Sequence, residues 1–263
     1  MNHGETTLMH DRRSRRPVRR ISVVLVTRAA AAGRVKTRLI CPEISAGQAA
    51  AIHAAFMRHM RGLVEEVAAI NPAAGGPHPQ AAPASLIMDG LAVEWDPVLF
   101  VDPLDQPVEQ FNWPGWRTVL QPPGDLGCRM KFAAAECFLK RADGAVFIGV
   151  DSVYLRAGHL HWAAVSLADC DAAMLPAHDG GYVAIGLRPA AEVLLDNIDW
   201  GTGAVAGQTR DRAAAAGLNL RTGEVLADID SPADMWNFMT LLQTRQDLAA
   251  KRLYSILRAI VPA

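Results

Sequence analysis

The chain has 263 residues, of which 51% are hydrophobic and 20% are charged, and its formal net charge is -1. This composition can bury a core, and the near-neutral charge excludes the chain-wide positive field on which nucleic-acid binding depends. Four cysteines lie far apart without a Cys-x-x-Cys pair, which argues against a zinc site or a disulfide framework and indicates a cytoplasmic protein.

Residues 1–20 are polar and contain six arginines, so we expect a flexible basic tail, with an anchor for acidic partners as the alternative. The apolar run that follows, 21–26, is too short for a signal peptide's hydrophobic segment or a membrane span. The sequence therefore predicts a tail followed by one domain over 21–263, with no membrane span.

From residue 21 onward the pattern predicts alternating strands and helices. Strands are predicted at 21–26, 85–88, 98–101, 145–150, 172–175, 182–187 and 224–227. Helices are predicted at 45–70, 127–141, 157–167, 190–195, 203–216 and from 232 onward, with a loop at 71–83. This alternation indicates an α/β fold of three layers, α/β/α, around a mostly parallel sheet.

A cationic loop follows the first predicted strand and reads Gly33-Arg-Val-Lys-Thr-Arg-Leu39. Gly33 lets the backbone turn close to a ligand, and Arg34, Lys36 and Arg38 alternate, so an extended segment would point them to one side. Cations at a strand end suit a phosphate group, and Thr37 is placed to cap a nearby helix. The loop predicts phosphate binding, with a solvated cationic turn as the alternative.

Acidic residues follow two other predicted strands, at the sheet edge where ligands bind. Asp151 follows the strand at 145–150, and either a metal site or a helix cap explains it. Asp228 and Asp230 follow the strand at 224–227, where a metal site and a plain helix start at Ser231-Pro232 are equally consistent with the pattern. Hard oxygen ligands of this kind favour Mg²⁺ or Mn²⁺.

The segment Asp179-Gly180-Gly181-Tyr182 separates two apolar runs and is typical of a tight turn. The same turn would present Asp179 and Tyr182 where the backbone closely approaches a substrate. Turn and substrate contact both remain open for these residues.

Six motifs in this order resemble the DUF2064 family, glycosyltransferase-A-like proteins that are also described as radical-SAM/selenodomain-associated transferases. The motifs are, in chain order, the strand before the cationic loop, the cationic loop itself, Gln121 to Met130, Ile148 to Ser152, Pro176 to Tyr182 and Asp228 to Asp234. The resemblance spans 21–239 and implies a nucleotide-diphospho-sugar transferase-like fold, related to nucleotidyltransferases.

The resemblance also implies roles for individual residues. The residues that it assigns to nucleotide binding are Gly33, Arg34, Lys36, Arg38, Gly124, Asp125, Gly127 and Arg129. Asp151, Lys36 and Asp179 are the implied catalytic residues, and Asp151, Asp228 and Asp230 the implied metal ligands. Gly180, Gly181 and Tyr182 are expected to face the acceptor.

This chain departs from the usual family sequence at three places. It reads Arg28-Ala-Ala-Ala-Ala-Gly33 where the family has Lys-Ala-Pro-x-Pro-Gly, and Gly149-Val-Asp-Ser-Val153 where the family has Gly-Thr-Asp-Ser-Pro. Cys128 stands where an acidic residue is common. The metal aspartate is retained, but the loops around it are altered.

The function implied is a metal-dependent transferase that takes a nucleotide-activated donor and transfers a glycosyl group to a small acceptor. The alternatives are a nucleotidyltransferase that releases pyrophosphate, a nucleotide-binding module that has lost catalysis, and a mainly structural protein. The apolar face of the C-terminal helical segment, 236–260, either covers the sheet or forms a homodimer interface.

Overall fold

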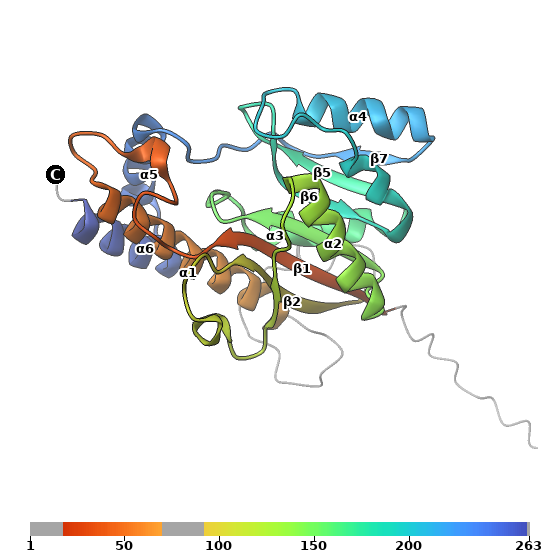
Figure 1. The fold of residues 1–263 in the computed structure, drawn as a ribbon, viewed down its shortest axis with the longest axis horizontal. Coiled ribbons are helices and arrows are strands. Elements are labelled where there is room, and N and C mark those ends of the chain that lie inside the picture. The colour runs from red at the N-terminus through yellow and green to blue at the C-terminus, as the bar shows by residue number, and fades with distance from the viewer. Residues whose placement is uncertain (1–17, 70–91, 262–263) are drawn as a thin grey trace, which may run out of the picture.

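The computed structural model describes residues 18–69 and 92–261, which contain a seven-stranded sheet (Figure 1). The strands are β1 (Val18–Arg28), β2 (Ala92–Asp102), β3 (Arg117–Leu120), β4 (Gly144–Gly149), β5 (Ala172–Pro176), β6 (Tyr182–Leu187) and β7 (Leu220–Thr222). They lie in the order β3-β2-β1-β4-β6-β5-β7. β6 is antiparallel to β4 and β5, and the other described pairs are parallel, which confirms the predicted mostly parallel sheet.

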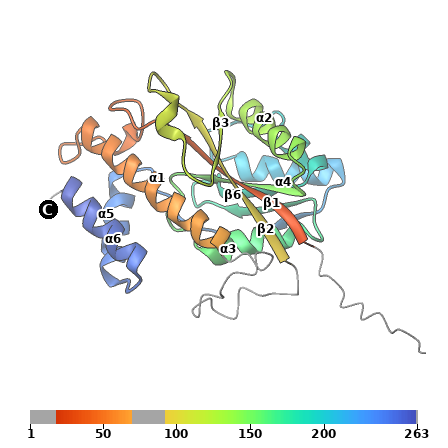
Figure 2. The same cartoon turned by 90° about the horizontal axis from the view of Figure 1, so that it is seen from below.

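Helices cover both faces of the sheet. The α-helices of the described residues are α1 (Ala46–Ala69), α2 (Leu126–Leu139), α3 (Ala157–Ser166), α4 (Val205–Ala216), α5 (Pro232–Thr244) and α6 (Leu248–Ile260), and the 3₁₀ helices there are η1 (Thr37–Leu39), η3 (Val108–Phe111) and η4 (Pro189–Leu195). Buried residues of α1, α3, α5 and α6 form one core with the sheet, and those of α2, η4 and α4 form the other. Figure 2 shows α1 and α6 side by side.

The central strand β1 shows why the sheet needs two covered faces. Val23 and Leu25 pack into the core beneath α1, whereas Val24 packs into the core beneath α2. Successive side chains of a strand point to opposite faces, so the continuous apolar run from Val23 to Leu25 becomes buried on both sides. The three-layer α/β/α architecture follows from this pattern.

Two strand predictions differ from the structure. The strand expected at 224–227 is wrong: β7 is Leu220–Thr222, and of the expected residues Leu226 alone makes an isolated bridge, to Ala177. β3 was not predicted. Both are short edge strands of mixed polarity, because one side of an edge strand faces no neighbouring strand, and the apolar signal is correspondingly weak.

The C-terminal helical region is divided in two. α5 ends at Thr244, Arg245 is extended, and Asp247 caps α6 by accepting a hydrogen bond from the Ala250 amide at 2.8 Å. The segment expected at 190–195 is a 3₁₀ helix, η4.

Other predictions fall at the limits of the described residues. Val18, Arg19 and Arg20 belong to β1 and not to the tail, while the rest of the expected tail lies outside the described residues. The loop expected at 71–83 and the strand expected at 85–88 also lie outside them. Among the helices that are described, none combines the length and apolar character needed to cross a membrane.

Candidate functional site

The cationic loop is folded into turns and is not extended as the sequence pattern assumed. Gly33 has a φ of 71° and Lys36 a φ of 49°, and η1 begins directly after Lys36. The expected extended alternation is therefore wrong, because two left-handed residues within four positions reverse the chain. Thr37 likewise begins η1 and caps no helix with its side chain.

Lys36 lies at the centre of the site. Its side chain is 5% exposed, and Nζ lies 2.9 Å from Oδ1 of Asp151, an ion pair whose approach angle is not that of a hydrogen bond. Nζ also donates to the carbonyl of Ile229 and lies 5.8 Å from the centre of the Phe56 ring. Because Ile229 stands between Asp228 and Asp230, one ammonium links the end of β4 to the segment that carries those two aspartates.

A cavity of about 560 Å³ opens beside this lysine. Its lining includes Arg34 and Lys36 of the cationic loop, Asp151, and Gly124, Asp125 and Arg129. The volume lies within the range of roughly 300–1,000 Å³ that is usual for small-molecule sites. The structure thus brings two sequence motifs, about ninety residues apart, into one pocket.

The N-terminus of α2 forms one side of this pocket. Asp125 caps the helix by accepting a hydrogen bond from the Cys128 amide at 2.7 Å, a bond that lowers the Asp125 pKa. Gly124, with a φ of 126°, turns the chain into the helix. A helix N-terminus with free amides and a cation nearby is a favourable place for a phosphate group.

Gln121 was not assigned a role from the sequence, yet it positions Arg129. Its Nε2 donates to the carbonyls of Thr27 at 2.8 Å and Phe100 at 2.9 Å, and its Oε1 accepts from Arg129 Nη1 at 3.2 Å. The first two bonds orient the amide, so the oxygen faces the guanidinium. The only sequence signal was its place directly after a strand that the sequence did not reveal.

His53 was also missed, and it lines the same pocket. Its Nε2 lies 2.9 Å from the carbonyl of Arg28 and 3.1 Å from Oγ1 of Thr27. Burial lowers the His53 pKa, and we assign the proton to Nε2 because a carbonyl can only accept. A polar residue on the apolar face of a helix was the available signal.

Three carboxylates form a separate acidic cluster. Asp179, Asp228 and Asp230 each offer an oxygen, and these atoms lie within 4.8 Å of one another. Two of them, Asp228 and Asp230, were expected as metal ligands, but the third is Asp179, which was expected to be catalytic. Asp151 lies outside this cluster and is paired with Lys36.

The cluster strongly affects Asp228. Burial raises the pKa of Asp228 to about 6, and the charges of Asp179, Asp230 and Asp151 add to the increase. Asp230 is partly neutralised by Arg38, whose Nη1 lies 2.7 Å from Oδ2. Three carboxylates this close repel one another unless a proton or a cation intervenes.

The helix-cap alternatives can now be decided. α3 begins at Ala157 after Arg156, so Asp151 caps no helix, and Ser152 donates from Oγ to the Val183 carbonyl at 3.0 Å. Ser231 and Asp234 form the capping box of α5, as the helix-start interpretation of this segment expected. The capping box of α5 uses neither the Asp228 carboxylate nor the Asp230 carboxylate, so both remain available for a ligand.

The turn residues expected to face an acceptor have clear packing roles. Gly180 has a φ of 89°, and an added Cβ would lie 2.1 Å from the carbonyl oxygen of Gly203. The Gly181 amide donates to Asp179 Oδ1 at 2.8 Å, and the Tyr182 ring packs edge-on against Trp200. Neither Gly180 nor Tyr182 lines the pocket beside Lys36.

Two of the glycines assigned to nucleotide binding differ in their structural roles: Gly127 is required for packing and Gly33 is not. An added Cβ on Gly127 would lie 2.6 Å from the Leu195 carbonyl oxygen, so this residue allows α2 to pack against η4. An added Cβ on Gly33 would meet nothing within 4 Å, so the positive φ, and not close packing, explains why this position is a glycine.

Residues 90–202 match the family described as "Uncharacterized protein conserved in bacteria (DUF2064)", which confirms the predicted resemblance over this part of the chain. The matched segment contains the Gly124 to Arg129 motif, Asp151 and Asp179. The cationic loop, Asp228 and Asp230 lie outside it. No curated protein matches the sequence.

Solved structures show the same fold. A provisionally assigned nucleotide-diphospho-sugar transferase from Desulfovibrio desulfuricans G20 is 24% identical, with a TM-score of 0.71, over 92% of this chain and 96% of that one. A 4-diphosphocytidyl-2C-methyl-D-erythritol synthase from Anaerococcus prevotii is 10% identical, with a TM-score of 0.51, over 86% of this chain and 99% of that one. At these identities the similarity establishes the nucleotide-diphospho-sugar transferase-like fold alone.

Proposed function

We propose that this chain is a metal-dependent transferase that uses a nucleotide-activated donor and transfers its glycosyl group to a small acceptor. The proposal rests on one juxtaposition: Lys36 lines a pocket suited to phosphate and also donates to the Ile229 carbonyl, which stands between Asp228 and Asp230 of the three-carboxylate cluster. Positive charge and helix amides on one side and hard oxygen ligands on the other are what a metal-bound diphosphate needs.

The acidic cluster fits a divalent cation. Asp179, Asp228 and Asp230 supply three carboxylates with oxygens within 4.8 Å of one another, and a bound cation would relieve the repulsion among them. Oxygen-only ligands favour Mg²⁺ or Mn²⁺, which retain coordination positions for substrate oxygens. Such an ion would neutralise the negative charge that develops on the leaving diphosphate.

The chain's own residues would bind and orient the donor. Arg34 and Arg129 line the pocket where they can pair with phosphate oxygens, and the amides at the start of α2 add neutral donors. Lys36 is held by Asp151 and Ile229, so its charge is fixed in place before a donor binds. Preorganised charge of this kind stabilises a leaving group without a protein nucleophile.

The cluster also changes the metal set inferred from the family. We propose Asp179, Asp228 and Asp230 as the direct ligands, with Asp151 acting on the same site through Lys36. Gly180, Gly181 and Tyr182 then support the turn that carries Asp179 and need not contact an acceptor.

Nucleotidyl transfer is the second candidate, because the fold is shared with the Anaerococcus prevotii 4-diphosphocytidyl-2C-methyl-D-erythritol synthase, whose name describes a nucleotide-containing product. In that reaction the acceptor attacks the α-phosphorus of a nucleoside triphosphate and pyrophosphate leaves. In glycosyl transfer the acceptor attacks the anomeric carbon of the sugar and a nucleoside diphosphate leaves.

Product analysis distinguishes these reactions. The purified chain is incubated with Mn²⁺, a panel of nucleoside triphosphates and nucleotide sugars, and candidate acceptors. Release of nucleoside diphosphate supports glycosyl transfer, and release of pyrophosphate supports nucleotidyl transfer. Metal-dependent nucleotide binding without either product across the panel would indicate a module that has lost catalysis, which the altered loops at 28–33 and 149–153 permit.

We also propose that residues 21–263 act as one domain in the cytoplasm. The four cysteines are all free thiols, as a reducing compartment requires. Detection of a disulfide in the freshly purified native protein would contradict this placement.

A further inference from the structure

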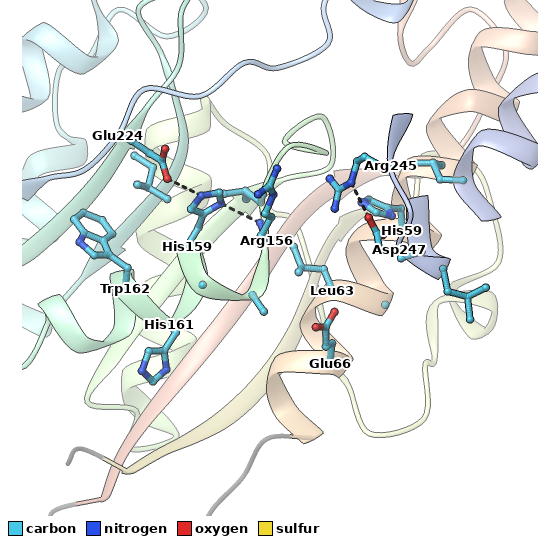
Figure 3. Close-up of a pocket in the computed structure, with 18 of the residues that line it drawn as sticks. His59, Leu63, Glu66, Arg156, His159, His161, Trp162, Glu224, Arg245 and Asp247 are labelled. Atoms are coloured by element: carbon cyan, nitrogen blue, oxygen red, sulfur yellow. Dashed lines mark hydrogen bonds and ion pairs between the residues drawn. The ribbon is translucent and has the colours of Figure 1, made fainter. Parts of the chain in front are cut away.

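A second and larger cavity has a lining separate from that of the pocket described above (Figure 3). Its volume is about 1480 Å³, and it is bounded by α1, α3, α6 and the residues after β7. No residue lines both cavities. We call it the α1/α3/α6 groove, and the proposed transferase chemistry does not use it.

The floor of the groove is apolar. Leu155, Leu253 and Trp162 line it together with Leu63 and Ile256. These side chains come from three separate parts of the chain, α1, residues 155–162 and α6, and Figure 3 labels Trp162 at the left and Leu63 near the centre of the view. A concave apolar surface of this extent is suited to the hydrocarbon or aromatic body of a ligand.

The lining carries an excess of positive charge, although the whole chain has a net charge of -1. Five arginines face three carboxylates around the groove. Two of those carboxylates already have partners: Asp247 is 2.7 Å from Arg245, and Glu224 is 2.7 Å from His159. Within residues 18–69 and 92–261, Arg58, Arg156 and Arg252 form no ion pair, so the groove presents uncompensated cations to a ligand.

Two helical glycines keep the groove open. Gly62 lies inside α1 and Gly158 at the start of α3, both line the cavity, and an added Cβ on either would meet nothing within 4 Å. A glycine in a helix costs about 0.5–1 kcal/mol relative to alanine, and neither residue is required for packing here. Their effect is to leave room for an occupant against the helix backbones.

A buried nitrogen adds a polar feature. His161 Nε2 is shielded from solvent and has no hydrogen-bond partner among the residues that the structure describes. His161 belongs to the groove lining, where Figure 3 shows it below Trp162. Buried polar atoms are nearly always hydrogen-bonded, so a missing partner is consistent with a ligand or water in this cavity.

From these observations we propose that the α1/α3/α6 groove binds a small amphipathic anion, with its apolar body on Trp162, Leu155 and Leu253 and its acidic head at Arg58, Arg156 and Arg252. A carboxylate and a sulfonate or phosphate head share the chemistry that guanidinium groups recognise. The site is separate from the proposed nucleotide pocket.

The groove also lies next to the segments that carry the acidic residues of the transferase site. Arg156 is five residues after Asp151, and Glu224 is four residues before Asp228. The hydrogen bond between His159 and Glu224 ties these two segments together at the groove wall (Figure 3). A ligand in the groove therefore contacts the supports of both segments.

The test uses 8-anilino-1-naphthalenesulfonate, an amphipathic anion whose fluorescence rises in apolar surroundings, with the full-length chain. Binding should saturate at one site per chain. Laurate should displace the dye, whereas dodecyltrimethylammonium, with the same chain length and the opposite charge, should not. Displacement by the cation as readily as by laurate would contradict the proposal.

Matched glycine variants separate groove filling from general effects. Gly62→Leu should weaken dye binding about tenfold or more while raising Tm, because the residue fills the groove and improves the helix. Gly207→Leu is the control: Gly207 lies in α4, outside the groove, and an added Cβ there also meets nothing within 4 Å. Equal affinity of wild type and Gly62→Leu would overturn the proposal.

Charge variants provide an independent test, should Gly62→Leu fail to fold. Arg58 and Arg156 are exposed, so Arg58→Gln/Arg156→Gln should fold normally and should lose the preference for laurate over the cation. A retained preference would overturn the proposal. Sedimentation of the wild type tests whether a second copy of the chain occupies the groove instead. If the wild type is a dimer that does not bind the dye, and Gly62→Leu dissociates this dimer, the small-anion proposal would also be overturned.

Discussion

Lys36 Nζ lies 2.9 Å from Asp151 Oδ1, and the two side chains differ sharply in exposure, at 5% for the lysine and 38% for the aspartate. The lysine adopts a left-handed backbone conformation, with a φ of 49°, to reach this position. Non-glycine residues pay about 1–2 kcal/mol for that conformation, so the ion pair and the bond to Ile229 must offset a local strain. This fixed ammonium is the link between the proposed phosphate pocket and the acidic cluster.

Lys36→Met should lower nucleotide affinity about tenfold or more, because a preorganised positive charge is lost from the pocket. It should also lower the free energy of unfolding by about 1–2 kcal/mol, less than for a fully buried pair because Asp151 is partly solvated. Calorimetric titration and urea unfolding measure the two effects.

The control for stability is Arg38→Met, whose side chain is 73% exposed beside Asp230. An exposed pair contributes about 0–1 kcal/mol, so this variant should unfold almost as the wild type does. The double variant Lys36→Met/Asp151→Asn should recover part of the stability lost in Lys36→Met. Strict additivity of the two substitutions would show that the pair makes no energetic contribution.

Asp228→Asn should increase stability at pH 7 and leave it unchanged near pH 4, measured without metal in a chelator. The Asp228 pKa is raised to about 6, so between roughly pH 4 and pH 6 the native state binds more protons than the unfolded state. Native stability then falls as pH rises through this window. After allowing for partial solvation, we expect a gain of about 1 kcal/mol in the variant at neutral pH.

The sign of this effect is the informative part. A wild-type stability that rises with pH from 4 to 6, by an amount that Asp228→Asn abolishes, would mean that Asp228 is stabilised as a carboxylate and that the cluster does not require a cation.

Gly180→Ala should destabilise the protein far more than Gly33→Ala, although both glycines have a positive φ. At Gly33 an added Cβ meets nothing within 4 Å, so only the backbone strain of about 1–2 kcal/mol applies. At Gly180 it would lie 2.1 Å from the Gly203 carbonyl oxygen, so the turn must move and we expect a total of about 3 kcal/mol or more. Thermal unfolding compares the two variants, and equal losses would exclude the packing role.

Gln121→Met should weaken nucleotide binding as much as Arg129→Met does. Gln121 orients Arg129 and is itself fixed by the carbonyls of Thr27 and Phe100. If the glutamine acts through the arginine, the double variant should bind nucleotide no more weakly than Arg129→Met alone. Gln110→Met, at an exposed glutamine in η3, is the control and should bind as the wild type. Additive losses would mean that Gln121 contacts the nucleotide directly.

The central strands and the order of helices could be predicted because their signals are local. The runs 145–150 and 172–175 are apolar throughout and 21–26 is apolar except for Ser22, as is typical of strands buried on both faces. β3 and β7 lie at the sheet edges, where polar residues such as the half-buried Arg117 and the exposed Arg221 hide the strand pattern. Their positions depend on neighbouring strands and not on their own composition.

The sequence identified several of the site residues, but it did not show which of them lie together. Asp228 and Asp230 were singled out because they follow the strand predicted at 224–227, yet Asp179 joins them because β7 lies beside β5 and Leu226 is bridged to Ala177. Sequence spacing does not reveal strand order. For the same reason the pattern of the cationic loop could not show that Lys36 turns inward to Asp151 while Arg38 reaches Asp230.

The acidic cluster is tested most directly by calorimetric titration of Mn²⁺ into the wild type, Asp228→Asn and Asp151→Asn, with and without a nucleotide. We predict one site in the wild type, a loss of about tenfold or more in Asp228→Asn, and a smaller loss in Asp151→Asn. Asp143→Asn, directly before the start of the central strand β4 and hydrogen-bonded to the Arg20 amide, should bind as the wild type. Unchanged Mn²⁺ affinity in Asp228→Asn, or nucleotide binding that is indifferent to the metal, would contradict the proposed metal-nucleotide site.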